Sequence, residues 1–225
     1  MDSKRQVEIS REALQQLAEH CPRLSKLCYW AGTAAIAIEE LHHRQSFDLD
    51  LHTREALYNV RPILAEIRAA FPGAFEVVQA PDEFGSGFQG LLTLPNGERI
   101  TIEVLSNYED VPASDLVDST TSHGMKRVSL ARYLADKIQC VVERVEARDL
   151  VDILFVLRVN PSMEELAHRL LADQDALLLV ERLLAWSDAE IEKDLRAYDD
   201  VSPTDAQEAR DLLLEWIKTD VAEDA

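Results

Sequence analysis

The hydrophobic pattern of the chain changes period once, near Ser129, and this change limits the folds that are open to it. Before that point, alternating segments typical of β-strands are interspersed with helical segments, among them a helix expected to begin at Ser10 and another over 54–70. After it, apolar residues recur every three or four positions to the C-terminus. An α+β fold is therefore expected, with a mixed sheet in 1–125 and a C-terminal helical region in 126–225 that packs on it.

Composition and charge argue against several classes of protein. The 225 residues carry a formal net charge of −19, so a protein that coats long stretches of DNA is not expected. No apolar run approaches the roughly 18 to 20 residues that a membrane-spanning helix needs, and the N-terminus has no apolar signal segment. Cys21, Cys28 and Cys140 form no metal-binding or disulfide pattern, which favours a cytoplasmic location.

The segment 47–52 alternates strictly between apolar and polar residues, which predicts a half-buried strand. Asp48 and Asp50 then project from one face, with Cα atoms about 6.5 to 7 Å apart. Two carboxylates at this spacing repel each other unless a cation lies between them, and their oxygens suit Mg²⁺. The alternative is an amphipathic edge strand that carries acidic residues on its wet face.

A later strand supplies a third carboxylate. The Asn-Gly pair at 96–97 lies between two β-forming runs and predicts a hairpin, whose second strand carries Glu103. If this strand pairs with the first, the three carboxylates converge. Such a triad can hold two metal ions, which activate a hydroxyl and stabilise a leaving pyrophosphate. The alternative is an exposed Glu103 that pairs with Arg99 or Lys126.

A short segment before the first strand predicts an anion site. Gly32 and Thr33 follow a short apolar run and precede an Ala-rich helical segment. Glycine permits a tight strand-to-helix turn, and the N–H groups and hydroxyl beside it can receive a triphosphate.

Two helices of the second half carry charged residues at core positions. Leu134, Lys137 and Val141 form one stripe, so Lys137 lies where an apolar side chain is expected. Its amine either reaches the surface or projects into a cleft to bind a triphosphate, and the second is favoured. Asp149 and Asp152 share one stripe of the next, largely apolar helix, where nearly buried acids need partners. They either orient Lys137 or act as a base, and a plain surface ion pair of Asp152 with Arg148 is the alternative.

Together, these segments resemble the DNA polymerase β-like nucleotidyltransferase superfamily and, within it, the AbiEii/AbiGii toxin family. The likeness rests on Ala31-Gly32-Thr33-Ala34-Ala35, on Arg44-Gln45-Ser46-Phe47-Asp48-Leu49-Asp50, and on Lys137 followed by Arg148-Asp149-Leu150-Val151-Asp152. The chain departs from the family pattern at Ala31, which stands in place of the first glycine.

The resemblance implies a metal-dependent nucleotidyltransferase with NTP as substrate and a two-metal Mg²⁺ site. It gives catalytic roles to Asp48, Asp50, Glu103, Lys137, Asp149 and Asp152, metal ligation to Asp48, Asp50 and Glu103, and nucleotide binding to Gly32, Thr33, Arg44, Ser46 and Lys137. Residues 1–125 would form the nucleotidyltransferase-fold domain, and 126–225 a helical domain that completes the active-site cleft.

The implied reaction transfers NMP to an acceptor hydroxyl of RNA, such as a tRNA 3′ end, or of a protein. The protein would be the toxin of a toxin–antitoxin or phage-defence system, with a cognate antitoxin as partner. Because the chain is acidic, RNA requires a small basic pocket, for which the candidates are Arg44, Arg54, Lys126, Arg127 and Arg132. Two alternatives stay open. One is nucleotide transfer to a small aminoglycoside-like molecule, and the other is a catalytically silent binding module, which is suggested by Ala31 in place of the first motif glycine.

Overall fold

The computed structural model describes residues 3–46, 48–144 and 146–223. The chain divides into two compact units, Met1–Ser129 and Leu130–Ala225. The first contains strands and helices and the second only helices in its described part, so the α+β fold predicted from the sequence is confirmed. Phe47, the first residue of the predicted acidic strand, lies outside the described residues.

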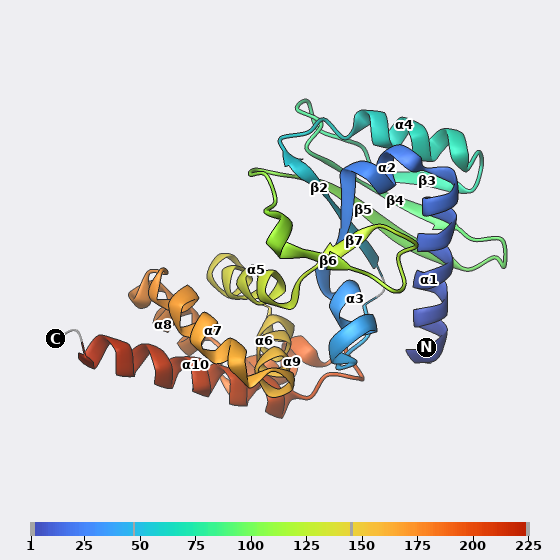
Figure 1. Ribbon diagram of the computed structural model, residues 1–225. Helices are drawn as coiled ribbons and strands as arrows, with labels where there is room; N and C mark the ends of the chain where they lie inside the picture. Colours follow the sequence, from blue (N-terminus) through green and yellow to red (C-terminus); the bar gives the residue numbers. More distant parts are fainter. Residues whose placement is uncertain (1–2, 47, 145, 224–225) are drawn as a thin grey trace. The chain divides into compact units, whose positions relative to one another are not determined.

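A mixed sheet is the frame of the first unit. Its strands are β1 (Cys28–Ala31), β2 (Asp48–Ala56), β3 (Phe75–Gln79), β4 (Gly87–Thr93), β5 (Arg99–Asn107), β6 (Leu116–Asp118) and β7 (Lys126–Val128). Within the described residues they form one seven-stranded sheet in the order β3-β4-β5-β2-β1-β7-β6 (Figure 1). At its centre β2 runs parallel to β5 and antiparallel to β1, and β4 and β5 form the predicted hairpin.

Alternation along the two central strands separates a core face from a polar face. Leu49 and Leu51 of β2 and Ile102 and Val104 of β5 are fully buried, whereas the residues between them are half-buried. Burial of these aliphatic side chains removes apolar surface from water and holds the two strands in register. The polar face of β2 and β5 is thereby fixed in orientation.

The helices of the first unit begin and end partly where the sequence predicts. They are α1 (Ser3–His20), α2 (Pro22–Leu27), α3 (Gly32–Ile36), the π-helical η1 (Ala37–Leu41), α4 (Arg61–Ala70) and the short η2 (Ala113–Asp115). Helices α1, α2 and α4 contact one another, and α1 and α2 also contact central strands of the sheet (Figure 1).

Two predicted helix boundaries were wrong. Ser10 is not an N-cap: it lies inside α1, which begins at Ser3, and its side chain is fully buried. Residues 54–56 continue β2, and the helix predicted over 54–70 begins only at Arg61, directly before Pro62. Proline is accommodated in the first turn of a helix, because it has no N–H to donate to a preceding turn.

The second unit is helical in its described part, as the sequence predicts. Its helices are α5 (Leu130–Glu143), α6 (Ala147–Val159), η3 (Pro161–Met163), α7 (Glu164–Ala172), α8 (Ala176–Ala185), α9 (Asp188–Leu195) and α10 (Pro203–Glu223). Helix α6 contacts α5, α9 and α10, which explains why it is apolar on nearly every side. No helix among the described residues is both long enough and apolar enough to cross a membrane.

Candidate active site

The parallel pairing of β2 with β5 brings three carboxylates onto one face of the sheet. Asp50 lies opposite Glu103 in the register, and Asp48 lies opposite Thr101. Side chains at paired positions of neighbouring strands point to the same side, and Asp48 and Asp50 are two residues apart. The pairing of β2 with β5, which the sequence alone left as a condition for the three carboxylates to converge, is therefore present.

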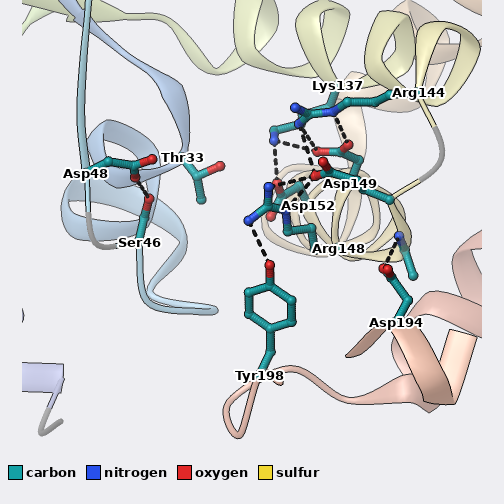
Figure 2. A network of polar contacts seen from close by, with 12 residues as sticks. Thr33, Ser46, Asp48, Lys137, Arg144, Arg148, Asp149, Asp152, Asp194 and Tyr198 are labelled. Carbon is teal, nitrogen blue, oxygen red and sulfur yellow. Dashed lines mark hydrogen bonds and ion pairs between the residues drawn. The ribbon is translucent and has the colours of Figure 1, made fainter. Parts of the chain in front are cut away.

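The electrostatics of this face show mutual repulsion between the carboxylates. Burial raises the pKa of Glu103, and the negative charge of Asp48 raises it further. Asp48 is also held by a neighbour, because the Ser46 hydroxyl donates a hydrogen bond of 2.7 Å to its Oδ1 atom (Figure 2). The strand face thus gathers negative charge that a cation would neutralise.

Gly32 packs directly against this face. It has a left-handed φ of 68°, and a Cβ atom at this position would overlap the carboxylate of Asp50. The overlap follows from the sheet, because Ala31 pairs with Asp50 in the antiparallel ladder between β1 and β2. Ala31 itself has φ −105° and ψ −168°, an extended conformation that alanine adopts without strain. The backbone therefore requires glycine at position 32 and not at position 31.

The turn after Gly32 carries a hydroxyl paired with a guanidinium. Thr33 is buried, and its Oγ1 atom accepts a hydrogen bond of 2.9 Å from Nη2 of Arg44. Arg44 belongs to the segment between η1 and β2, so two segments of the candidate nucleotide site meet here. The first unit thus brings together all seven of its predicted site residues: Gly32, Thr33, Arg44, Ser46, Asp48, Asp50 and Glu103.

The chemistry of this donor set suits a hard divalent cation. Asp48, Asp50 and Glu103 offer only oxygen ligands on one face, and Mg²⁺ prefers oxygen and keeps part of its shell for water or phosphate. Burial and, to a smaller extent, the charge of Asp48 raise the pKa of Glu103, and such an ion would favour the ionised carboxylate. Within the described residues, no group of three or more His, Cys, Asp or Glu side chains is already arranged so that it could hold a metal ion.

The second unit contains a buried cluster of charged residues around Lys137. Its Nζ atom lies 2.7 Å from Oδ1 of Asp149 and 2.8 Å from Oδ2 of Asp152 (Figure 2). Both aspartates are fully buried, and only 7% of the Lys137 surface is exposed. The lysine in the apolar stripe of α5 is therefore matched by the two acids in the apolar helix α6.

Two members of this cluster, Arg144 and Tyr133, were not predicted from the sequence. Arg144 contacts both carboxylate oxygens of Asp149, with Nε 3.0 Å from Oδ2 and Nη2 3.1 Å from Oδ1. The ring of Tyr133 lies under Lys137, 5.4 Å from its Nζ atom to the ring centroid. Arg144 follows the last residue of α5, where no helical period applies, and Tyr133 reads as an ordinary core residue. Two cations thus balance two buried anions.

The sequence from 32 to 216 matches the family described as nucleotidyl transferase AbiEii toxin, Type IV TA system. The chain belongs to this AbiEii family. It is accordingly a nucleotidyltransferase of a toxin family, and the resemblance on which the sequence analysis relied is confirmed. The match begins at Gly32 and contains both the carboxylate strands and the Lys137 cluster.

Solved structures share the fold at low identity. MenT4, a nucleotidyltransferase toxin from Mycobacterium tuberculosis, is 16% identical with a TM-score of 0.59, over 94% of this chain and 82% of its own. JHP933 from Helicobacter pylori is 15% identical with a TM-score of 0.55, over 99% of this chain and 97% of its own. These likenesses support the fold. No curated protein matches the chain in sequence.

Most of the basic residues predicted to line an RNA pocket in this AbiEii chain are engaged with acids. Arg127 is buried, and its guanidinium lies 2.7 Å from Glu39 and 2.5 Å from Glu40. Lys126 pairs with Asp118 and Arg132 with Asp136, at 2.6 Å and 2.8 Å. Arg44 contacts Thr33 at the Gly32 turn, and Arg54 is half-buried on β2. Four of these five basic residues belong to the first unit, whereas Arg132 belongs to the second. The first unit alone therefore does not contain the complete basic pocket that the sequence predicts.

Proposed function

We propose that this AbiEii protein is a metal-dependent toxin that transfers NMP from NTP to an acceptor hydroxyl. In this reaction the acceptor oxygen bonds to the α-phosphorus, the bond to pyrophosphate breaks, and the acceptor hydroxyl loses its proton. The observation that carries the proposal is the shared face of Asp48, Asp50 and Glu103 beside the Gly32 turn.

The three carboxylates have the proposed role of metal ligands. Mg²⁺ bound there would supply positive charge for the triphosphate and for the developing negative charge of the transition state. Ser46 is proposed to position Asp48, because its hydroxyl already donates to that carboxylate. Because Gly32 has no side chain, the Asp50 carboxylate can occupy the space beside it, and this packing is proposed to hold Asp50 in place as a metal ligand.

The proposed nucleotide ligands are the polar groups of the Gly32 turn. The Arg44 guanidinium presents donors in a planar fork that suits phosphate oxygens, and its bond to Thr33 holds it at the turn. Lys137 is proposed as a further ligand of the triphosphate. For Asp149 and Asp152, orientation of Lys137 is proposed over a role as base, since both oxygens of Asp149 accept hydrogen bonds from cationic side chains.

The acceptor and the biological setting complete the proposal. The acceptor is a hydroxyl of RNA, such as a tRNA 3′ end, or of a protein, and a cognate antitoxin is the proposed partner in a cytoplasmic toxin–antitoxin system. The family description, which places such chains in Type IV toxin–antitoxin systems, supports the setting.

The test is label transfer with a matched pair of variants. The protein is incubated with each α-³²P-labelled NTP, Mg²⁺ and total cell extract, and the products are separated by size with and without RNase. Asp48→Ala/Asp50→Ala removes two carboxylates from the polar face. Glu55→Gln removes one exposed negative charge from the same strand and serves as control.

Each outcome has a distinct meaning. Label in a macromolecule with the unaltered protein and the Glu55 variant, but not with the double variant, supports the proposal. RNase sensitivity then separates an RNA acceptor from a protein acceptor. Label only in a small molecule would favour the small-molecule transferase. Tight NTP binding that is independent of Mg²⁺, with no label in any fraction, would favour the silent module.

A further inference from the structure

Three large apolar side chains stand exposed at one end of the sheet. Leu57 is 69% exposed, Phe84 78% and Tyr108 87%. Leu57 directly follows β2, Tyr108 directly follows β5, and Phe84 lies in the loop before β4. Because β2 and β5 are parallel and β4 is antiparallel to β5, these three loops leave or enter the same end of the sheet. We refer to the three residues as the apolar triad.

Backbone hydrogen bonds join the three loops to one another. The loop after β2 donates a bond to the last residue of β5 and another to the loop before β4, and the end of β5 donates a bond to the loop before β4. The donor and acceptor pairs are Leu57 N to Asn107 O at 2.7 Å, Val60 N to Gly85 O at 2.9 Å, and Ser106 N to Ser86 O at 2.7 Å. The apolar triad is therefore carried by one connected backbone.

Side-chain contacts fix these loops further. Asp82 accepts hydrogen bonds from the N–H and the hydroxyl of Ser86, at 2.9 Å and 2.6 Å, and so closes the loop that carries Phe84. Asp110 accepts a bond of 2.8 Å from the Ala56 N–H and closes the loop that carries Tyr108. Leu57 has a left-handed φ of 48°, which leucine rarely adopts. Large exposed apolar side chains that are grouped at one place are typical of interaction surfaces, and strained backbone such as that of Leu57 occurs preferentially at functional sites.

Each member of the apolar triad has an exposed glutamate beside it. Glu55, Glu83 and Glu109 lie within two residues of Leu57, Phe84 and Tyr108. None of the three carboxylates pairs with a cation or accepts a hydrogen bond within the described residues. One exposed cation, Arg61, contacts the Glu83 carbonyl in the loop that carries Phe84. The three glutamates outnumber it, so this end of the sheet combines exposed apolar side chains with an excess of negative charge.

We propose that this end of the sheet docks a protein partner through a segment that combines basic and apolar side chains. The glutamates disfavour RNA and an anionic lipid surface, because both carry negative charge. They also disfavour a second copy, since this acidic chain would meet its own negative surface. Asp48 begins β2 and Leu57 follows its last residue, so about 25 to 30 Å of strand separates the apolar triad from the carboxylate end.

The experiment uses three synthetic twelve-residue peptides on the full chain. One alternates Lys and Leu, the second replaces Lys by Glu, and the third replaces Leu by Ser. Binding is measured by fluorescence anisotropy, and hydrogen exchange maps the protected backbone. The variants are Leu57→Ser/Phe84→Ser/Tyr108→Ser and Glu55→Lys/Glu83→Lys/Glu109→Lys. The matched control is Leu177→Ser, which changes an exposed apolar residue of α8 in the second unit, outside the sheet.

The proposal expects saturable binding of the Lys/Leu peptide alone, with protection at residues 55–60, 82–86 and 106–110. The triple Ser variant should weaken it at least tenfold, the triple Lys variant at least threefold, and Leu177→Ser less than twofold. Thermal unfolding checks that the variants fold. Absence of saturable binding, equal binding of the Glu/Leu peptide, an unchanged affinity in the triple Ser variant, or self-association lost in that variant would each overturn the proposal. None of these readouts depends on nucleotidyl transfer.

Discussion

The carboxylate of Asp50 occupies the space that a side chain at position 32 would need. Gly32 directly follows β1 and begins α3, and Asp50 lies on the neighbouring strand β2, opposite Ala31. The strand-to-helix turn and the candidate metal ligand therefore form one packing unit. Within this unit the left-handed φ of Gly32 and the position of Asp50 depend on each other.

Gly32→Ala should abolish most of the transfer activity. The new Cβ must displace the Asp50 carboxylate, and the left-handed backbone costs an L-residue about 1 to 2 kcal/mol. A ligand displaced by about 1 Å is expected to lower kcat/KM at least 100-fold. Label transfer measures the loss, and thermal unfolding measures the change in stability.

Ala31→Gly is the matched control, because Ala31 already has an extended backbone that does not need glycine. This variant should change kcat/KM less than threefold. A Gly32→Ala protein with normal activity would remove Asp50 from the proposed mechanism, whereas a large gain in Ala31→Gly would show that Ala31 impairs the turn.

The sequence was sufficient for the polar face because alternation is a local property. A strict period of two fixes which side each residue of β2 faces, and the same holds for β5. The pairing of Asp50 with Glu103 is a long-range contact that the pattern permitted without specifying. The Gly32–Asp50 packing is also long-range, so the sequence could not show which of positions 31 and 32 requires glycine.

Helix boundaries and cluster membership were less predictable. Ser10 has the residue type of an N-cap, yet tertiary packing buries it within α1. Residues 54–56 lack a clear period of two, and the strand persists there through pairing with β5, in which Ala56 lies opposite Asn107. Arg144 is a member of the Lys137 cluster but lies in the segment between α5 and α6. A connecting segment has no regular period from which the position of a side chain could be predicted.

Ser46→Ala should weaken metal dependence more than nucleotide binding. The Ser46 hydroxyl donates to Asp48 Oδ1, and loss of a group that orients a metal ligand lowers metal affinity about 10- to 100-fold. The Mg²⁺ concentration for half-maximal transfer should therefore rise about tenfold, while KM for NTP at saturating Mg²⁺ changes less than threefold. Ser46→Thr keeps the hydroxyl and should stay close to the unaltered protein. The opposite pattern, with a raised KM and unchanged Mg²⁺ dependence, would make Ser46 a direct nucleotide ligand.

Glu103→Gln should stabilise the metal-free protein at neutral pH. The pKa of Glu103 is raised, so between its usual value near 4.5 and the raised value the folded state binds more protons than the unfolded state. Stability contributed by this group is therefore lost as pH rises through that window. In EDTA at pH 7.5 the variant should melt about 1 to 3 °C higher, and at pH 3.5 the difference should vanish.

Mg²⁺ provides the internal control for this measurement. The ion should raise the melting temperature of the unaltered protein more than that of Glu103→Gln, since a ligand that binds only the folded state stabilises it. A variant that is less stable than the unaltered protein in EDTA at pH 7.5 would contradict the raised pKa of Glu103, to which burial and the charge of Asp48 contribute.

Lys137→Met should destabilise the second unit strongly. The substitution leaves Asp152 buried without its lysine, and removal of one partner of a buried ion pair costs about 3 to 5 kcal/mol. Lys193→Met serves as control, because Lys193 is exposed and its pair with Glu190 is expected to contribute less than about 1 kcal/mol. Denaturant unfolding measures both changes.

The double variant Lys137→Met/Asp152→Asn separates charge balance from function. It removes one buried cation and one buried anion together, while Arg144 still neutralises Asp149. More than half of the stability lost in Lys137→Met should return. If Lys137 binds the triphosphate, label transfer stays at least 100-fold reduced in the refolded double variant, and KM for NTP rises where activity is measurable. If transfer returns with stability, Lys137 serves only to neutralise the buried aspartates.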